Sequence, residues 1–192
     1  MKNAIILHGT SCNPDSFWQP SIKKFLERKG YDVWVPALPD ADTPDLKKWL
    51  PAVLNNGMFN KNTIIMGHSA GGPLVLSVLE NINTQIHKAV LVAGYARRID
   101  KPELILQDKY NWKKIKGNVR DLVFINSDND PWGCDHKEGI YMWENLGGTL
   151  IVREGEGHMG SSFKQPYTKF PLLEKILEVE YTRSTIDGSD KK

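Results

Sequence analysis

Short apolar runs alternate with longer amphipathic segments along almost the whole chain. The runs are rich in Val, Ile or Leu and several are closed by Gly, Pro or Asn, which is typical of strands buried on both faces. The predicted strands cover residues 4–8, 32–36, 63–67, 89–93, 121–126 and 149–153. Because strands that alternate with helices form βαβ units, the pattern predicts an α/β fold: a three-layer α/β/α sandwich around a mostly parallel six-stranded sheet.

Five longer segments with a 3.6-residue periodicity are the predicted helices, at residues 16–29, 44–55, 70–82, 135–146 and 166–181. Asp135, with Glu138 three residues later, is typical of a helix start, and Gly30 and Asn83 follow the first and third helices as helix-ending residues. Residues 95–117 form one irregular span. It has room for a short helix and a modest lip over a site, but not for a large lid domain.

Length and composition indicate a single domain. The chain has 192 residues, of which 40% are hydrophobic, which is ordinary for one globular core. We expect residues 1–181 to form this domain. Residues 182–192 are polar and have little to bury, so we expect them to be a disordered tail.

The charge balance argues against a polyanionic partner. The chain has 25 Lys and Arg against 23 Asp and Glu, a net charge of +2, so we expect no nucleic-acid partner and no membrane attachment. The apolar stretch before His8 is too short for a signal peptide, and no run approaches a membrane span. Cys12 and Cys134 form no CxxC pair and predict reduced thiols and a cytoplasmic location. The oligomeric state stays open.

The segment Gly-His-Ser-Ala-Gly at residues 67–71 matches G-x-S-x-G between a predicted strand and a predicted helix. A turn this sharp strains the backbone of Ser69 and requires small residues two positions away on each side, where Gly67 and Gly71 stand. The Ser69 hydroxyl would then project at the top of the sheet beside a helix N-terminus. The alternative is that Ser69 only caps that helix.

A serine hydroxyl becomes a nucleophile when a base accepts its proton and a third group orients the base. His158 follows the last predicted strand in Gly-Glu-Gly-His and is the predicted base; the alternative is a surface histidine in a flexible loop. Asp130 and Asp128, both after the fifth strand, compete for the orienting role. Asp130, which precedes Pro131 at a tight turn, is favoured, although either aspartate could simply form the turn.

The remaining predicted site residues come from the same edge of the sheet, where ligands bind in parallel α/β folds. The backbone N–H groups of Thr10 and Ala70 are the predicted oxyanion hole. Trp18, Trp132 and Met159, with Phe163, are candidate pocket residues, and packing in the core or at the rim is the alternative for each.

Several short motifs occur together across nearly the whole chain. They are His8-Gly9, Trp18, Gly30, Pro36, Pro39, Trp49, the segment 67–71, Ser127 with Asp130-Pro131, and Gly157-His158. On these residues the sequence resembles the α/β-hydrolase superfamily, and within it the small lidless serine hydrolases of the retinoblastoma-binding protein 9 type and their bacterial esterase-like relatives. The resemblance implies a minimal α/β-hydrolase fold without a large lid.

The same resemblance implies Ser69 as nucleophile, Asp130 as orienting acid and His158 as base. Two positions depart from the pattern: Cys134 stands where relatives often have proline, and Met159 where they often have an aromatic residue. Both departures bear on the pocket, so the substrate is left open. The L-x-C-x-E motif that binds the retinoblastoma pocket is missing, and that partner is not expected.

Three other patterns fail as cofactor or metal motifs. Residues 155–160 match G-x-G-x-x-G, but only 32 residues follow. A dinucleotide site needs an acidic residue at the end of the next strand, about 20 positions on, and Glu178 and Glu180 fall inside a helical pattern instead. Residues 126–137 resemble the start of a calcium loop but have Pro131 and Lys137 where glycine and glutamate are needed. Cys134 with His136 supplies only two soft ligands. We therefore expect no cofactor and no metal.

Together these features predict a serine hydrolase that cleaves small to medium carboxylic esters through an acyl-serine intermediate. An amide or a short peptide is a second substrate class. The alternatives are a non-catalytic binding protein on a hydrolase scaffold, since fold does not fix function, and an acyltransferase or lyase that uses the same turn.

Overall fold

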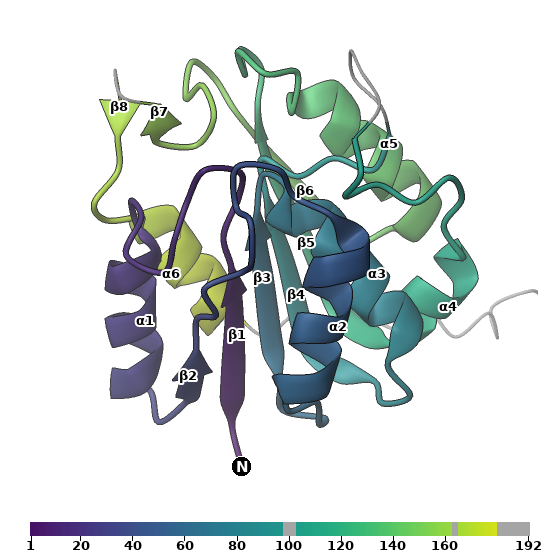
Figure 1. The fold of residues 1–192 in the computed structure, drawn as a ribbon. Coiled ribbons are helices and arrows are strands. Elements are labelled where there is room, and N and C mark those ends of the chain that lie inside the picture. The colour runs from purple at the N-terminus through teal and green to yellow at the C-terminus, as the bar shows by residue number, and fades with distance from the viewer. Residues whose placement is uncertain (98–102, 163–164, 180–192) are drawn as a thin grey trace, which may run out of the picture.

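A computed structural model describes residues 1–97, 103–162 and 165–179. Six parallel strands form its central sheet in the order β2-β1-β3-β4-β5-β6 (Figure 1). The strands are β1 (Asn3–Leu7), β2 (Asp32–Trp34), β3 (Ile64–His68), β4 (Ile86–Val92), β5 (Val119–Ser127) and β6 (Thr149–Arg153). The chain therefore starts in the interior of the sheet, builds out to β2, and then crosses back to add β3 through β6. All six strands were predicted, each to within three residues.

Helices cover both faces of this sheet (Figure 1). They are α1 (Gln19–Arg28), α2 (Leu46–Asn56), α3 (Gly71–Asn81), α4 (Trp112–Gly117), α5 (His136–Leu146) and α6 (Pro171–Glu178). Helices α1 and α6 pack together on one face, and α2, α3, α4 and α5 follow one another across the other. The predicted three-layer α/β/α sandwich is confirmed, and the described residues include no lid domain.

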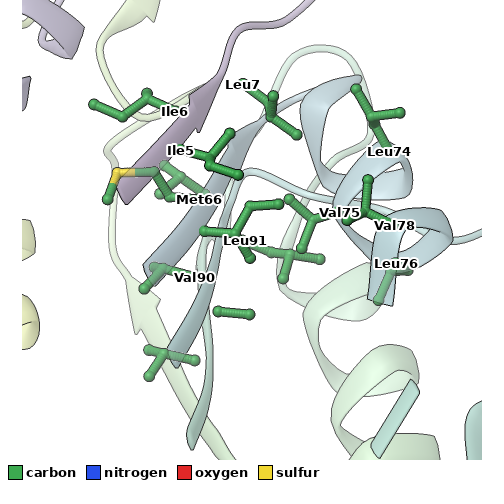
Figure 2. Packing of buried hydrophobic residues seen from close by; sticks show 14 of the residues in the cluster. Ile5, Ile6, Leu7, Met66, Leu74, Val75, Leu76, Val78, Val90 and Leu91 are labelled. Atoms are coloured by element: carbon green, nitrogen blue, oxygen red, sulfur yellow. The ribbon is translucent and has the colours of Figure 1, made fainter. Parts of the chain in front are cut away.

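Alternating side chains of the inner strands fill the two layers of the core (Figure 2). Ile5 and Leu7 of β1 point toward α3, whereas Ile6 points to the opposite face, where Met66 of β3 lies beside it. Helix α3 is buried along residues 71–79 because the sheet and its neighbouring helices enclose it. This explains why its sequence is apolar on every side rather than amphipathic.

The last helix begins later than the sequence predicts. Residues 161–166, part of which was assigned to that helix, contain a two-stranded antiparallel pair, β7 (Ser161–Ser162) and β8 (Gln165–Pro166). Strands of two residues leave no periodic pattern to detect. Proline at the N-terminus of α6 marks the true start of the helix. The predicted tail at 182–192 lies outside the described residues.

None of the helices in the described ranges is long and apolar enough to cross a membrane.

A fully buried lysine joins the sheet to α6. Lys88 of β4 is 0% exposed, forms an ion pair with Asp121 of β5 at 3.2 Å, and donates a hydrogen bond to the carbonyl oxygen of Ile176 at 2.8 Å. No pattern in the sequence predicts a charged side chain at this depth. Its partners at the C-terminal end of α6 compensate the loss of hydration, since helix carbonyls there are otherwise unpaired.

Replacing Lys88 by Met should lower the free energy of unfolding by about 3 to 5 kcal/mol, because the Asp121 carboxylate and the helix carbonyls lose their buried partner. Urea denaturation would measure the loss. The matched control is Lys23→Met, which removes a side chain 46% exposed and paired only at 3.9 Å and should change the stability by less than about 0.5 kcal/mol. Equal unfolding midpoints for the two variants would contradict this account.

Candidate active site

The turn between β3 and α3 holds Ser69 in a strained backbone conformation. Its φ is +53°, in the left-handed region that non-glycine residues rarely adopt. The Ser69 N–H donates to the carbonyl oxygen of Val92 at 3.0 Å, and the Ser69 carbonyl accepts from Gly72 N at 2.8 Å. These bonds fix the strained residue between its two neighbouring elements, as the predicted strand-turn-helix context requires.

Three glycines, which have no side chain, allow the backbone to approach Ser69 closely. A Cβ at Gly67 would lie 2.1 Å from the carbonyl oxygen of Gly71, and one at Gly71 would lie 2.5 Å from that of Leu7. A Cβ at Gly9, in the loop after β1, would lie 2.8 Å from the Cβ of Ser69. Glycine at these positions lets three chain segments meet around the serine.

The loop after β1 also brings a free backbone donor to this turn. Within the described residues, the amides of Thr10 and Ala70 donate to no protein acceptor, whereas the amide of Ser11 donates to Ala41 O at 2.8 Å. Thr10 lines the cavity that contains Ser69. Ala70 directly follows Ser69 and is itself buried. Neither amide is therefore engaged by an acceptor of the described chain, and their role as an oxyanion hole stays a prediction.

His158 and Asp130 form a buried pair at the same end of the sheet. Nδ1 of His158 lies 2.5 Å from Oδ2 of Asp130, and the two side chains are 4% and 0% exposed. Because a carboxylate only accepts, Nδ1 carries the proton in this contact, and the lone pair of a neutral ring is then on Nε2. The imidazole and Ser69 line one cavity. The fold thus places His158, which contacts Asp130, in the wall of the same cavity as Ser69, although the three residues are 28 to 89 positions apart in the sequence.

The two candidate aspartates have different partners. The loop of residues 154–158, which carries His158 and is called the histidine loop below, is held by three successive side chains. They accept hydrogen bonds from its main-chain N–H groups: Ser127 Oγ from Glu156 (3.0 Å), Asp128 Oδ1 from Gly155 (2.8 Å) and Asn129 Oδ1 from Gly157 (2.8 Å). Asp128 is exposed and holds the backbone of that loop, whereas Asp130 contacts the imidazole itself. The geometry favours Asp130 as the orienting group.

His68, the second residue of the turn motif, contacts the main chain of the histidine loop. Its Nε2 lies 3.3 Å from the carbonyl oxygen of His158, and its ring packs against Trp18. Burial lowers the pKa of His68 to about 3, so the ring is neutral and donates a hydrogen bond through Nε2. No sequence pattern predicts this contact with residue 158, because it exists only in the folded chain.

The cavity has a volume of about 600 Å³ and is walled mainly by loops that follow β1, β2, β4 and β5. Residues that sequence reasoning missed make up much of the wall: Phe17, Asp42, Thr43, Pro44, Tyr95, Glu103, Leu104 and Ile105. The last four come from the irregular span 95–117, which forms the predicted lip and contains α4; residues 98–102 lie outside the described part. The hydroxyl of Tyr95 donates a hydrogen bond to Glu103. Only position at a strand end could have indicated these residues.

Of the predicted pocket residues within the described chain, Trp132 lines the cavity, and Trp18 and Met159 do not. Trp132 lines the cavity, is 55% exposed, and packs its ring edge-on against His158 at 4.6 Å between centroids. Trp18 does not line it: this side chain is 1% exposed and packs between His68 and Phe170 in the core. Met159 does not line it either: this residue is fully buried, has a φ of +51°, and lies beside a separate, smaller cavity. Phe163 lies outside the described residues.

Both cysteines line the cavity as free thiols, Cys12 half-buried and Cys134 buried. Burial raises the pKa of each thiol, so both are protonated at neutral pH.

The model of the serine hydrolase family matches residues 4–179, and the chain belongs to this family. It is 27% identical to the putative hydrolase YdeN of Bacillus subtilis over 193 residues, covering 96% of this chain and 98% of that protein. It is 26% identical to the serine hydrolase RBBP9 of Rattus norvegicus over 146 residues, covering 73% and 77% of the two chains.

Solved structures agree with the fold. The structure of the B. subtilis ydeN gene product superposes with a TM-score of 0.84 at 22% identity, covering 92% of this chain and 97% of that one. Mouse α/β hydrolase domain-containing protein 10 superposes with a TM-score of 0.68 at 11% identity, covering 91% and 87%. The predicted α/β-hydrolase fold is confirmed.

Replacing Gly67 by Ala should destabilise the protein by about 1 to 3 kcal/mol or more, because the added methyl group meets backbone rather than a side chain that can move. The control is Gly117→Ala, whose Cβ would meet nothing within 4 Å and which should be neutral or slightly stabilising. Thermal unfolding of both variants would measure the difference. A Gly67 variant as stable as the Gly117 variant would show that the turn is not closed as described.

Proposed function

We propose that this serine hydrolase cleaves small to medium carboxylic esters through an acyl-serine intermediate, with Ser69 as nucleophile, His158 as base and Asp130 as the orienting acid. The observation that carries the proposal is the buried contact between His158 Nδ1 and Asp130 Oδ2 beside the strained turn of Ser69. Membership of the serine hydrolase family supports it independently.

The reaction begins when Ser69 Oγ attacks the ester carbonyl and transfers its proton to His158 Nε2. Asp130 stabilises the imidazolium that forms, since its carboxylate is buried and already hydrogen-bonded to Nδ1. The imidazolium then gives its proton to the departing alcohol, which leaves an acyl-serine. Water attacks this ester with His158 again as base, releasing the carboxylic acid and restoring Ser69.

Negative charge that develops on the carbonyl oxygen needs fixed donors. The amides of Thr10 and Ala70 fill this role in the proposal, because both are free of protein acceptors while Ser11 is engaged. The N-terminus of α3, directly after Ala70, adds the positive end of a helix dipole. Because both donors are main-chain N–H groups, replacing the side chain of Thr10 or Ala70 would not remove them.

The cavity suits an acyl group of modest size. Its volume of about 600 Å³ is in the usual range for small-molecule sites. Leu104 and Trp132 expose apolar surface along its wall, at 69% and 55% exposure. Such a surface accepts a short acyl chain without a lid domain to enclose it.

An activity-based test separates this proposal from its rivals. A fluorophosphonate should label the wild-type protein and leave Ser69→Ala unlabelled, since the probe reacts with an activated serine. Absence of labelling in the folded wild type would favour a binding protein. A panel of p-nitrophenyl esters and aminoacyl amides would define the substrate class, and a product formed with competing alcohols would indicate an acyltransferase instead.

Replacing Asp130 by Asn should lower kcat by about 10³- to 10⁴-fold, because the amide no longer stabilises the imidazolium or fixes its tautomer. The matched control, Asp128→Asn, keeps an oxygen that can accept from Gly155 N and should cost far less. Steady-state kinetics on one p-nitrophenyl ester would compare them. The reverse ranking would assign the orienting role to Asp128.

The value of kcat/KM should decrease as the pH is lowered from about 8 to about 5, because a histidine base accepts a proton only when it is neutral. His68, whose pKa burial lowers to about 3, stays neutral over this range. A His68→Gln variant can therefore lower the rate but should keep the inflection of the acid limb at the same pH. A flat wild-type profile would exclude His158 as the base.

A further inference from the structure

Cys134 completes a cluster of potential metal ligands with two members of the proposed catalytic site. One ligand atom each from Asp130, Cys134 and His158 lies within 4.8 Å of the other two, and all three side chains are buried. The thiol has no part in the acyl-transfer steps. Sequence reasoning considered only His136 as a partner for Cys134; the fold supplies His158 and Asp130 instead.

The surroundings of this cluster are strongly acidic. Four nearby carboxylates raise the pKa of the Cys134 thiol: those of Asp130, Glu103, Glu138 and Asp135. Among the described ion pairs, one involves a member of this group, Glu138, which pairs with Arg97 at 2.7 Å. The cavity wall includes Asp42 and Glu103, but none of its described residues is Lys or Arg. A site lined by one sign of charge concentrates the opposite ion.

We propose that Asp130, Cys134 and His158 bind a thiophilic divalent cation, Zn²⁺ or Cd²⁺, and that the bound cation inhibits hydrolysis. Thiolate, imidazole and carboxylate are the donors that zinc takes in proteins, and thiolate favours soft ions over Mg²⁺ and Ca²⁺. The inhibitory effect rests on the proposed function, whereas the binding itself does not.

The geometry needs only small adjustments. Bonds of about 2.0 to 2.3 Å in a tetrahedral site place ligand atoms about 3.3 to 3.8 Å apart. The longest separation in the cluster, at most 4.8 Å, would close by about 1 Å, and the 2.5 Å contact between His158 Nδ1 and Asp130 Oδ2 would open by a similar amount. The open cavity gives an entry path and room for a water molecule as fourth ligand.

Binding would remove the base from the reaction. The thiol of Cys134 releases its proton to solvent as the metal–sulfur bond forms, and the neutral imidazole of His158 binds through Nδ1 with its proton moved to Nε2. Nε2 then has no lone pair with which to accept the proton of Ser69. The cation then replaces the hydrogen bond that orients the imidazole, and it neutralises the carboxylate that would stabilise the imidazolium. Ser69 is not a ligand but loses an oriented proton acceptor.

Cadmium titration of the purified protein tests the site directly, because thiolate-to-cadmium charge transfer absorbs in the ultraviolet. Wild type should develop this band and lose ester hydrolysis over the same range of Cd²⁺ or Zn²⁺, with activity restored by EDTA. The test variants are Cys134→Ala and Cys134→Ser, which keeps a polar side chain. Because Cys134 lines the cavity, inhibition in each variant is measured relative to that variant's own rate without metal. Both should lack the band and need about ten-fold or more metal for inhibition.

Two controls separate the alternatives. Cys12→Ser removes the other thiol of the cavity and should retain both the band and the inhibition. Ser69→Ala should retain the band although it abolishes hydrolysis. A wild-type protein that develops the band but hydrolyses no ester would support the metal site and contradict the proposed function. Inhibition of equal strength in wild type and both Cys134 variants, or a band that survives their substitution, would overturn the proposal.

Discussion

The close approach of three backbone segments around Ser69 is the constraint on which the site depends. Gly67, Gly71 and Gly9 lie where a Cβ would meet another part of the chain at 2.1 to 2.8 Å. Because glycine has no side chain at these three positions, Ser69 can adopt a φ of +53° at the end of β3. The strain is tolerated because the turn is anchored in a sheet and a helix that are buried on all sides.

The loops around this turn divide the tasks of holding and orienting. Ser127, Asp128 and Asn129 bind main-chain N–H groups of the histidine loop, and Asp130 contacts the imidazole. Four consecutive residues at the end of β5 therefore fix both the path of a distant loop and the ring that it carries. This arrangement explains why a polar segment with so many turn-forming residues ends the longest strand of the sheet.

The same compactness places a thiol and several carboxylates against the proposed base. Cys134 is buried beside Asp130 and His158, and the cavity wall is acidic. A site arranged to stabilise an imidazolium, which is a cation, also offers a favourable environment to a metal cation. Selectivity for the reaction over metal binding would then depend on keeping the thiol protonated, as its burial and the nearby carboxylates do by raising its pKa.

The sequence by itself determined the six strands, the helix pattern and the turn motif, because hydrophobic periodicity and glycine spacing are local properties of the chain. It also indicated Ser69, His158 and the pair of aspartates as candidates. The sequence also favoured Asp130 over Asp128, and only the tertiary structure showed which groups each aspartate contacts. The tertiary structure also excluded Trp18 and Met159 from the cavity wall and added Phe17 and Glu103 to it. These features depend on contacts between loops far apart in sequence, whose directions are set by packing and not by any pattern within the loops themselves.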